Sequence, residues 1–108
     1  MKLTKKELEI MCVLWEKKIP LTAAEIIEAS SDRTWQEGSV YAIMNTLIKK
    51  GAVILAMHKP TGGNHARAYE PIITSEDYMV KYIGSARDTG IRISIPTLIE
   101  RLLKIEEE

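Results

Sequence analysis

The stretch that decides the fold is WQEGSVYAIMNTLIKKG, residues 35–51 of the chain. Apolar residues recur in it at intervals of three and four, which predicts a helix over about residues 36–50 with one buried stripe. The stripe consists of Val40, Ile43, Met44, Leu47 and Ile48. Two lysines followed by Gly51 are typical of a helix C-terminus, where cations meet the helix dipole and glycine takes the left-handed conformation.

The face of this helix opposite the apolar stripe is small and polar. At about 100° per residue, that face carries Gly38, Ala42, Asn45 and Lys49, flanked by Ser39, Tyr41 and Thr46. A helix with such a face can approach a partner closely and hydrogen-bond to it. The major groove of DNA is the first candidate for this partner.

Two shorter helices are predicted before residue 35. Thr4 with Glu7, and Thr22 with Glu25, have the spacing of a capping box, so we expect helices to open at both threonines. Pro20 separates the two helices. Their predicted buried stripes are Leu8, Met11, Cys12 and Trp15 in the first helix, and Ala23, Ile26 and Ile27 in the second. Three helices in this order make a helix-turn-helix.

A β-hairpin is predicted after Gly51. Residues 52–58 and 67–73 have the composition of strands, and Pro60, Gly62, Gly63 and Asn64 mark a turn between them. The turn segment, residues 59–65, is longer than a tight turn needs. A helix-turn-helix followed by a hairpin is a winged helix, so residues 52–73 would be a wing that touches DNA through basic residues.

Two more amphipathic helices are predicted, over about residues 75–88 and 95–105. Their apolar stripes follow a complete winged helix in the sequence and have no partner within it. We therefore expect them to be buried against a second copy of the chain. The predicted dimer interface consists of Tyr78, Met79, Tyr82, Ile83, Leu98, Ile99, Leu102 and Leu103. The predicted fold is therefore mainly α with a small β-hairpin: a winged helix-turn-helix DNA-binding domain over residues 1–74 and a helical dimerisation region over residues 75–108.

Composition is that of a globular protein. Of 108 residues, 45% are hydrophobic and 28% are charged. No apolar run is long enough to cross a membrane and no signal peptide is present, so we expect a soluble, cytoplasmic protein. The formal net charge is zero, but the first 74 residues carry an excess of cations and the remainder an excess of acids. This distribution fits a weakly basic binding half.

Enzymatic and metal chemistry find little support in the sequence. The single Cys12 rules out an internal disulfide, and we expect a buried structural thiol rather than a reactive one. His58 and His65 could form a metal pair across the hairpin, but two histidines without a third ligand are better interpreted as solvated wing residues. No nucleophile with a base and no phosphate loop is present, so neither an enzyme nor a cofactor is expected.

The polar helix face and the wing supply the candidate DNA contacts. Ser39, Ala42, Asn45 and Thr46 are predicted to face base edges, and Lys49, Lys50, Lys59, Arg67 and Tyr41 to hold the DNA backbone. An asparagine can bond bidentately to adenine, and an alanine methyl can touch the thymine methyl. Two alternatives stay open: Asn45 could instead bond to the turn before its helix, and Lys50 could serve only the helix dipole. We expect Trp35 to anchor the turn on the core rather than to stack on a base.

Four stretches, residues 3–15, 20–27, 35–51 and 68–72, together resemble the penicillinase-repressor family, the BlaI/MecI group of small bacterial repressors. The resemblance runs in register over residues 3–73. It implies a homodimeric winged-helix repressor of a promoter with a two-fold symmetric operator, with the third helix in the major groove. Some relatives sense copper through C-terminal cysteines, which this chain lacks. The resistance repressors are inactivated by cutting within the dimerisation helices, but no cleavage site is identified here, so an inducing protease or sensor stays unassigned.

The chain departs from the family on the predicted groove face. Family members commonly carry a basic residue where Gly38 stands and often an arginine where Thr46 stands, and their Ser-Pro after the tryptophan is here Gln36-Glu37. Fewer cations and an added carboxylate imply a different operator or weaker affinity. Together with zero net charge, Glu37 also suits an alternative function, a winged-helix module for protein–protein contact without specific DNA binding.

Overall fold

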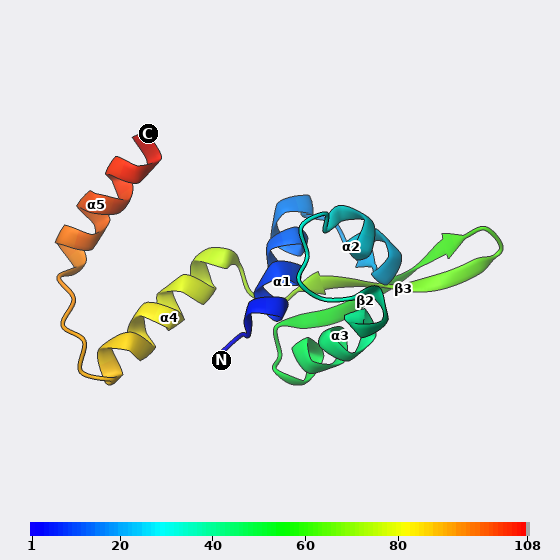
Figure 1. The fold of residues 1–108 in the computed structure, drawn as a ribbon, viewed down its shortest axis with the longest axis horizontal. Helices are drawn as coiled ribbons and strands as arrows, with labels where there is room; N and C mark the ends of the chain where they lie inside the picture. The colour runs from blue at the N-terminus through cyan, green and yellow to red at the C-terminus, as the bar shows by residue number, and fades with distance from the viewer. Residues whose placement is uncertain (108) are drawn as a thin grey trace. The chain divides into compact units, whose positions relative to one another are not determined.

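The computed structural model describes residues 1–107. Its contacts divide the chain into two compact units, one spanning Met1–Tyr78 and the other beginning at Met79. The elements are α1 (Lys5–Lys17), β1 (Leu21–Thr22), α2 (Ala23–Ala29), the 3-10 turn η1 (Glu37–Ser39), α3 (Val40–Lys49), β2 (Val53–Thr61), β3 (Asn64–Pro71), α4 (Ser75–Asp88) and α5 (Ile95–Glu107) (Figure 1). The predicted fold class, a mainly helical winged helix-turn-helix followed by further helices, is confirmed.

Capping boxes start α1 and α2, as the sequence predicts. The backbone N–H of Thr4 donates to Glu7 Oε1 at 2.7 Å, and the backbone N–H of Glu7 donates to the Thr4 hydroxyl at 3.2 Å. Thr22 and Glu25 repeat the arrangement at 2.9 and 3.2 Å. Each box satisfies N–H groups that a helix start leaves without partners, which fixes where both helices begin.

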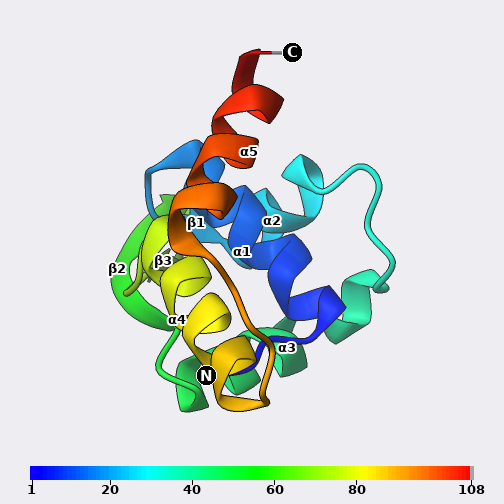
Figure 2. The ribbon, with the colours of Figure 1, turned by 90° about the vertical axis from the view of Figure 1, so that its left-hand side faces the viewer.

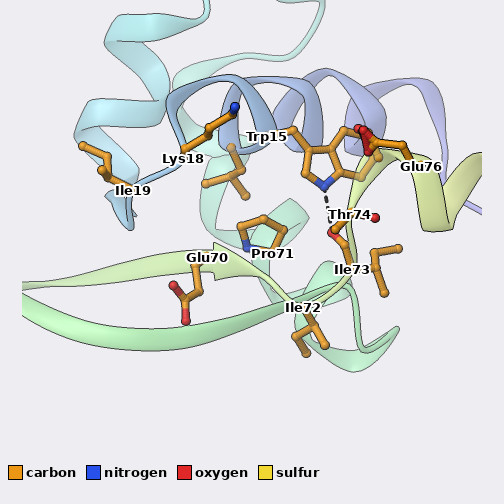
Figure 3. A pocket seen from close by; sticks show the side chains of 11 residues that line it. Trp15, Lys18, Ile19, Glu70, Pro71, Ile72, Ile73, Thr74 and Glu76 are labelled. Carbon is orange, nitrogen blue, oxygen red and sulfur yellow. Dashed lines mark hydrogen bonds between the residues drawn. The ribbon is translucent and has the colours of Figure 1, made fainter.

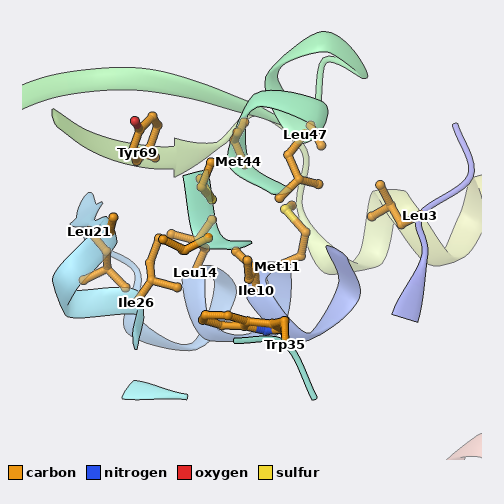
Figure 4. Close-up of a cluster of buried hydrophobic side chains, with 14 of the residues drawn as sticks. Leu3, Ile10, Met11, Leu14, Leu21, Ile26, Trp35, Met44, Leu47 and Tyr69 are labelled. Carbon is orange, nitrogen blue, oxygen red and sulfur yellow. The ribbon is translucent and has the colours of Figure 1, made fainter. Parts of the chain in front are cut away.

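The core of the first unit lies between α1, α2, α3 and the sheet (Figure 4). Its largest fully buried side chains are Ile10, Met11 and Leu14 from α1, Ile26 from α2, Val40, Met44 and Leu47 from α3, and Val53 from β2. Trp35 packs into the same cluster and is only 2% exposed, so its predicted place as a core anchor is confirmed. On α3, Ile43 is partly buried and Ile48 is exposed, so the buried stripe is narrower than predicted.

The buried stripe predicted for α1 is wrong by one residue. The buried positions are Glu7, Ile10, Met11 and Leu14, whereas Cys12 is exposed and Leu8 and Trp15 are partly buried. The observed set and the predicted set have the same helical spacing, but the observed set begins on a charged residue, Glu7, and the predicted set begins on Leu8. Burial of Glu7 is possible because the capping box and a lysine satisfy its carboxylate.

The hairpin is tighter than the sequence predicts. Thr61 pairs with Asn64, so the connection is only Gly62-Gly63 rather than a loop over residues 59–65. The φ angles of these glycines are +52° and +102°, and a two-residue turn with both φ values positive suits the right-handed twist of the strands. Pro60 lies inside β2, which it can do because β2 is an edge strand.

The sheet also contains a strand that the sequence does not predict. Leu21 of β1 pairs with Tyr69 and Thr22 pairs with Ala68, which gives the strand order β1-β3-β2. A bulge between Leu55 and Met57 shifts the register of β2 on β3. A two-residue strand is too short to have a detectable alternation, and Thr22 is at the same time the N-cap of α2.

The second unit has no interior of its own. Figure 2 shows α4 and α5 as separate helices; residues 89–94 join them, and this linker begins with a turn at Thr89 and Gly90. None of the described residues from 79 to 107 is buried. Both helices lie close to their predicted positions. Among residues 1–107, none of the helices combines the length and the apolar character that a bilayer span requires.

Candidate nucleic-acid interface

The outer face of α3 gathers most of the residues predicted to face bases. Ala42, Asn45 and Thr46 are exposed, whereas Ser39 in η1 is partly buried. The Thr46 hydroxyl donates to the Ala42 carbonyl oxygen at 3.0 Å, so this hydroxyl is engaged within the helix. The Asn45 side chain forms no hydrogen bond within residues 1–107, so the alternative in which it holds the preceding turn finds no support. Its amide is available to a partner.

Of the residues predicted to hold the DNA backbone, Tyr41, Lys49 and Arg67 are exposed. Tyr41 is 63% exposed beside the face of α3 just described. Lys49 lies in the last turn of α3. Arg67 lies on β3 in the wing. None of these three side chains has a hydrogen-bond or ion-pair partner within residues 1–107, so each is available to a phosphate.

Lys50 has an internal partner. Its ammonium donates to Glu7 Oε1 at 2.6 Å and to the backbone carbonyl oxygen of Lys2 at 2.8 Å. These bonds tie the end of α3 to the start of α1, a role that neither sequence-based interpretation of Lys50 contains. Burial alone would raise the pKa of the Glu7 carboxyl, but the hydrogen bonds from Lys50 and the Thr4 backbone outweigh burial, so the pKa is lowered.

Lys59 has a similar partner. Its ammonium lies 3.1 Å from Glu25 Oε1, which connects the wing to the start of α2. The pKa of Glu25 is lowered by the backbone hydrogen bond from Thr22 and by Lys59, against the opposing effect of burial. Both capping-box glutamates therefore hold a lysine that was predicted to bind phosphate. An ammonium has three N–H donors, so each lysine can keep its carboxylate and still donate to a phosphate.

Lowering of the Glu7 pKa gives a testable pH dependence of stability. A carboxyl with a depressed folded-state pKa stabilises the fold above its unfolded pKa, near 4.5, and this contribution disappears as pH falls through the folded-state pKa. Glu7→Gln is therefore expected to lower the free energy of unfolding by about 1–2 kcal/mol at pH 7. The difference from wild type should shrink below pH 4.5. Urea unfolding at pH 7 and pH 3.5 measures it, with Glu16→Gln on the exposed side of α1 as control. An equal difference at both pH values would contradict the assignment.

A hydrogen-bond network that the sequence does not predict holds the turn between α2 and α3. The backbone N–H and the hydroxyl of Thr34 donate to Glu9 of α1 at 2.8 and 2.5 Å. Both hydrogen bonds lower the pKa of the Glu9 carboxyl, and the bond from the Thr34 hydroxyl has the larger effect. The guanidinium of Arg33 lies 5.3 Å from the Trp35 ring centroid and 3.5 Å from Glu37 Oε1. Glu37, the carboxylate added on the groove side, is thus paired with a cation.

One of the residues predicted for the dimer interface, Tyr78, is buried within the single chain. Tyr78 is 5% exposed within the first unit, where its ring centroid lies 6.1 Å from that of Trp15. In the single chain it is therefore a core residue of the winged helix. Of the remaining predicted interface residues, Met79, Tyr82, Ile99, Leu102 and Leu103 are exposed, and Ile83 and Leu98 are partly buried.

The first unit also contains an open pocket of about 350 Å³ between α1 and the segment that joins β3 to α4 (Figure 3). Trp15 lies in its wall, and its indole N–H donates to the Ile73 carbonyl oxygen at 2.8 Å. The described residues contain no group of three or more histidine, cysteine or acidic side chains that could hold a metal ion.

Three helices, of which the third has an exposed polar face, are followed by a β-hairpin. This is the arrangement of a winged-helix DNA-binding protein. The family model described as penicillinase repressor matches residues 3–107, nearly the whole chain. The chain belongs to the penicillinase repressor family, as the resemblance in the sequence indicates. A search among curated proteins finds no match. This is a family of DNA-binding transcriptional repressors, that is, of regulators rather than enzymes. DNA-binding repression of transcription is therefore the general function of the chain.

Proposed function

We propose that the chain represses transcription in the cytoplasm as a homodimer that binds an inverted-repeat operator, with α3 in the major groove and the β2–β3 hairpin as the wing. The observation that carries this proposal is the division of α3 into two faces. Val40, Met44 and Leu47 are fully buried and fix the helix on the core. On the other face, Ala42 and Asn45 are exposed, with side chains suited to a thymine methyl and an adenine edge.

The second unit supports the homodimer. Residues 79–107 include no buried residue but carry several large apolar side chains. Exposed apolar surface of this kind marks a site where a partner binds. The exposed apolar side chains on α4 and α5 are Met79, Val80, Tyr82, Ile95, Ile99, Leu102, Leu103 and Ile105. A second copy brings the same stripes, and an isologous two-fold contact covers both copies at once. Two-fold symmetry of the protein then requires two-fold symmetry of the operator.

Selection of bound DNA from a random pool tests the operator. Two copies of α3 related by a two-fold axis should enrich an inverted repeat whose half-site centres lie about 10 base pairs apart, or a multiple of that distance. The selection is done at low salt, where the affinity for DNA is higher and weak binding can be detected. Enrichment of a single unrepeated half-site would contradict the dimer, and failure to enrich any sequence would contradict specific binding.

Arg67→Ala is expected to weaken binding to all sequences alike, because an exposed wing cation contacts the DNA backbone. The log–log slope of affinity against salt should fall in magnitude by about 2 for a dimer with both wings engaged. Titrations of the selected duplex over a salt series measure this slope. Arg87→Ala on α4 removes an exposed cation outside the wing and serves as the matched control. An unchanged slope would remove Arg67 from the interface.

Asn45→Ala should instead relax the preference at one position per half-site. The loss against the preferred base should be about 1–3 kcal/mol, the discrimination that a bidentate contact provides. Binding to a panel of duplexes with single base changes measures it. Asn64→Ala at the hairpin turn is the control, since it removes an exposed asparagine without touching α3. A uniform loss over the whole panel would show that Asn45 does not read a base.

A further inference from the structure

Both histidines of the chain lie on the same face of the wing. In the hairpin register His58 stands directly opposite Arg67, and Pro60 directly opposite His65. Opposite residues of an antiparallel pair share a face, as do residues two apart on one strand. His58, Pro60, His65 and Arg67 therefore form one surface, which we call the histidine face. All four residues are exposed.

The acidic groups near the wing belong to its other face. Lys59 alternates with His58 and Pro60 along β2, and its ammonium reaches Glu25 of α2 at 3.1 Å. Glu70 falls on the same side as Lys59, because Lys59 pairs with Ala66 and residues 66, 68 and 70 share a face along β3. Arg67 is thus the charged group that the sheet places beside the histidines. A cation beside two imidazoles, with the carboxylates turned away, favours an anion as the ligand of this face.

We infer that His58 and His65 join Arg67 as phosphate contacts of the wing, so that the charge of the histidine face depends on pH. This inference rests on the proposed DNA binding. Imidazole is the side chain whose charge changes between pH 5 and pH 8, and when protonated it donates from both ring nitrogens. A dimer carries four such groups, on a protein whose formal net charge is zero with histidine neutral. Their protonation therefore changes the electrostatic attraction to DNA substantially.

The direction of the effect follows from linkage. A phosphate contact stabilises the protonated imidazole, so DNA binding takes up protons and the affinity rises as pH falls from 7.5 to 6.0. Each proton that the dimer takes up on binding raises the affinity by up to tenfold for every unit by which the pH falls. Each engaged imidazole should also steepen the salt dependence by about 0.9 in log–log slope.

The test compares wild type with two double variants, His58→Gln/His65→Gln and His58→Arg/His65→Arg, all as full-length chains. The probes are a duplex selected from a random pool at pH 7.5 and a scrambled duplex, each titrated at pH 7.5 and pH 6.0. Wild type is expected to bind both duplexes several-fold tighter at pH 6.0 than at pH 7.5, because phosphate contacts carry no sequence information. The glutamine variant should lose this difference. The arginine variant should also lose it, while binding tightly at both pH values.

The outcomes separate the inference from the proposed function. Specific binding at pH 7.5 that does not change at pH 6.0 would overturn the inference and leave the repressor standing. A pH dependence that persists in the glutamine variant would place the titrating group elsewhere and would overturn it too. No binding to either duplex at either pH would overturn both proposals. Thermal unfolding of the three proteins at both pH values checks that the exposed substitutions leave the fold intact.

Discussion

Replacement of Trp35 by alanine is expected to lower the free energy of unfolding by about 3–5 kcal/mol, the cost of removing a large aromatic side chain from a packed core. Trp35 is 2% exposed, packs into the main hydrophobic cluster and carries the Arg33 guanidinium over its ring. It stands just before η1 and α3, so its loss removes a side chain that packs the entry to α3 onto the core. Urea unfolding followed by circular dichroism measures the change.

Trp35→Phe is the matched control for this prediction, because it keeps an aromatic ring in the core and should cost less than the alanine variant. Trp15→Ala should also cost less, since Trp15 is only partly buried. Unchanged unfolding of Trp35→Ala combined with loss of DNA binding would contradict the prediction. Trp35 would then have to contact DNA itself.

Leu102→Asp is expected to convert the proposed homodimer into monomers while the winged helix stays folded. Leu102 is 50% exposed in the single chain, so a carboxylate there costs the monomer little. In a dimer seam formed by the α5 stripe, the same carboxylate would be buried without a partner, at a cost of several kcal/mol. Sedimentation velocity at micromolar concentration measures the association, and the unfolding transition reports on the winged helix.

Arg101→Asp is the control for Leu102→Asp, because it also introduces a carboxylate on α5 but outside the apolar stripe. This variant should remain dimeric. A wild-type chain that sediments as a monomer would contradict the homodimer outright. A Leu102→Asp protein that still dimerises would show that the seam uses other residues.

Local rules in the sequence account for most of the helices. Thr4 with Glu7, and Thr22 with Glu25, form the predicted capping boxes, and the period of α3 gives its buried face. These features depend on residues three or four apart, whose relation is fixed by the helix itself. Family resemblance then gives the order of helices and wing, which the structure and the family match confirm.

Interactions between distant parts of the chain could not be predicted in this way. Lys50 was assigned to DNA or to the helix dipole, but its partner Glu7 lies 43 residues away. Cys12 was placed in the core because a stripe that begins on a glutamate looks polar until its hydrogen bonds are known. Strand β1 exists only because β3 returns beside it. Whether the assigned residues contact DNA stays a prediction.

Binding to the selected duplex and to a scrambled duplex over a salt series tests the central claim most directly. Lys5, Lys6, Lys49, Lys50, Lys59 and Arg67 are the candidate phosphate contacts in each subunit. If half of them engage, a dimer neutralises about six phosphates and the log–log slope of affinity against salt should be about −5. We expect this slope together with tighter binding to the selected duplex. Equal affinity for both duplexes, or no binding at low salt, would contradict the account and favour a module for protein contact.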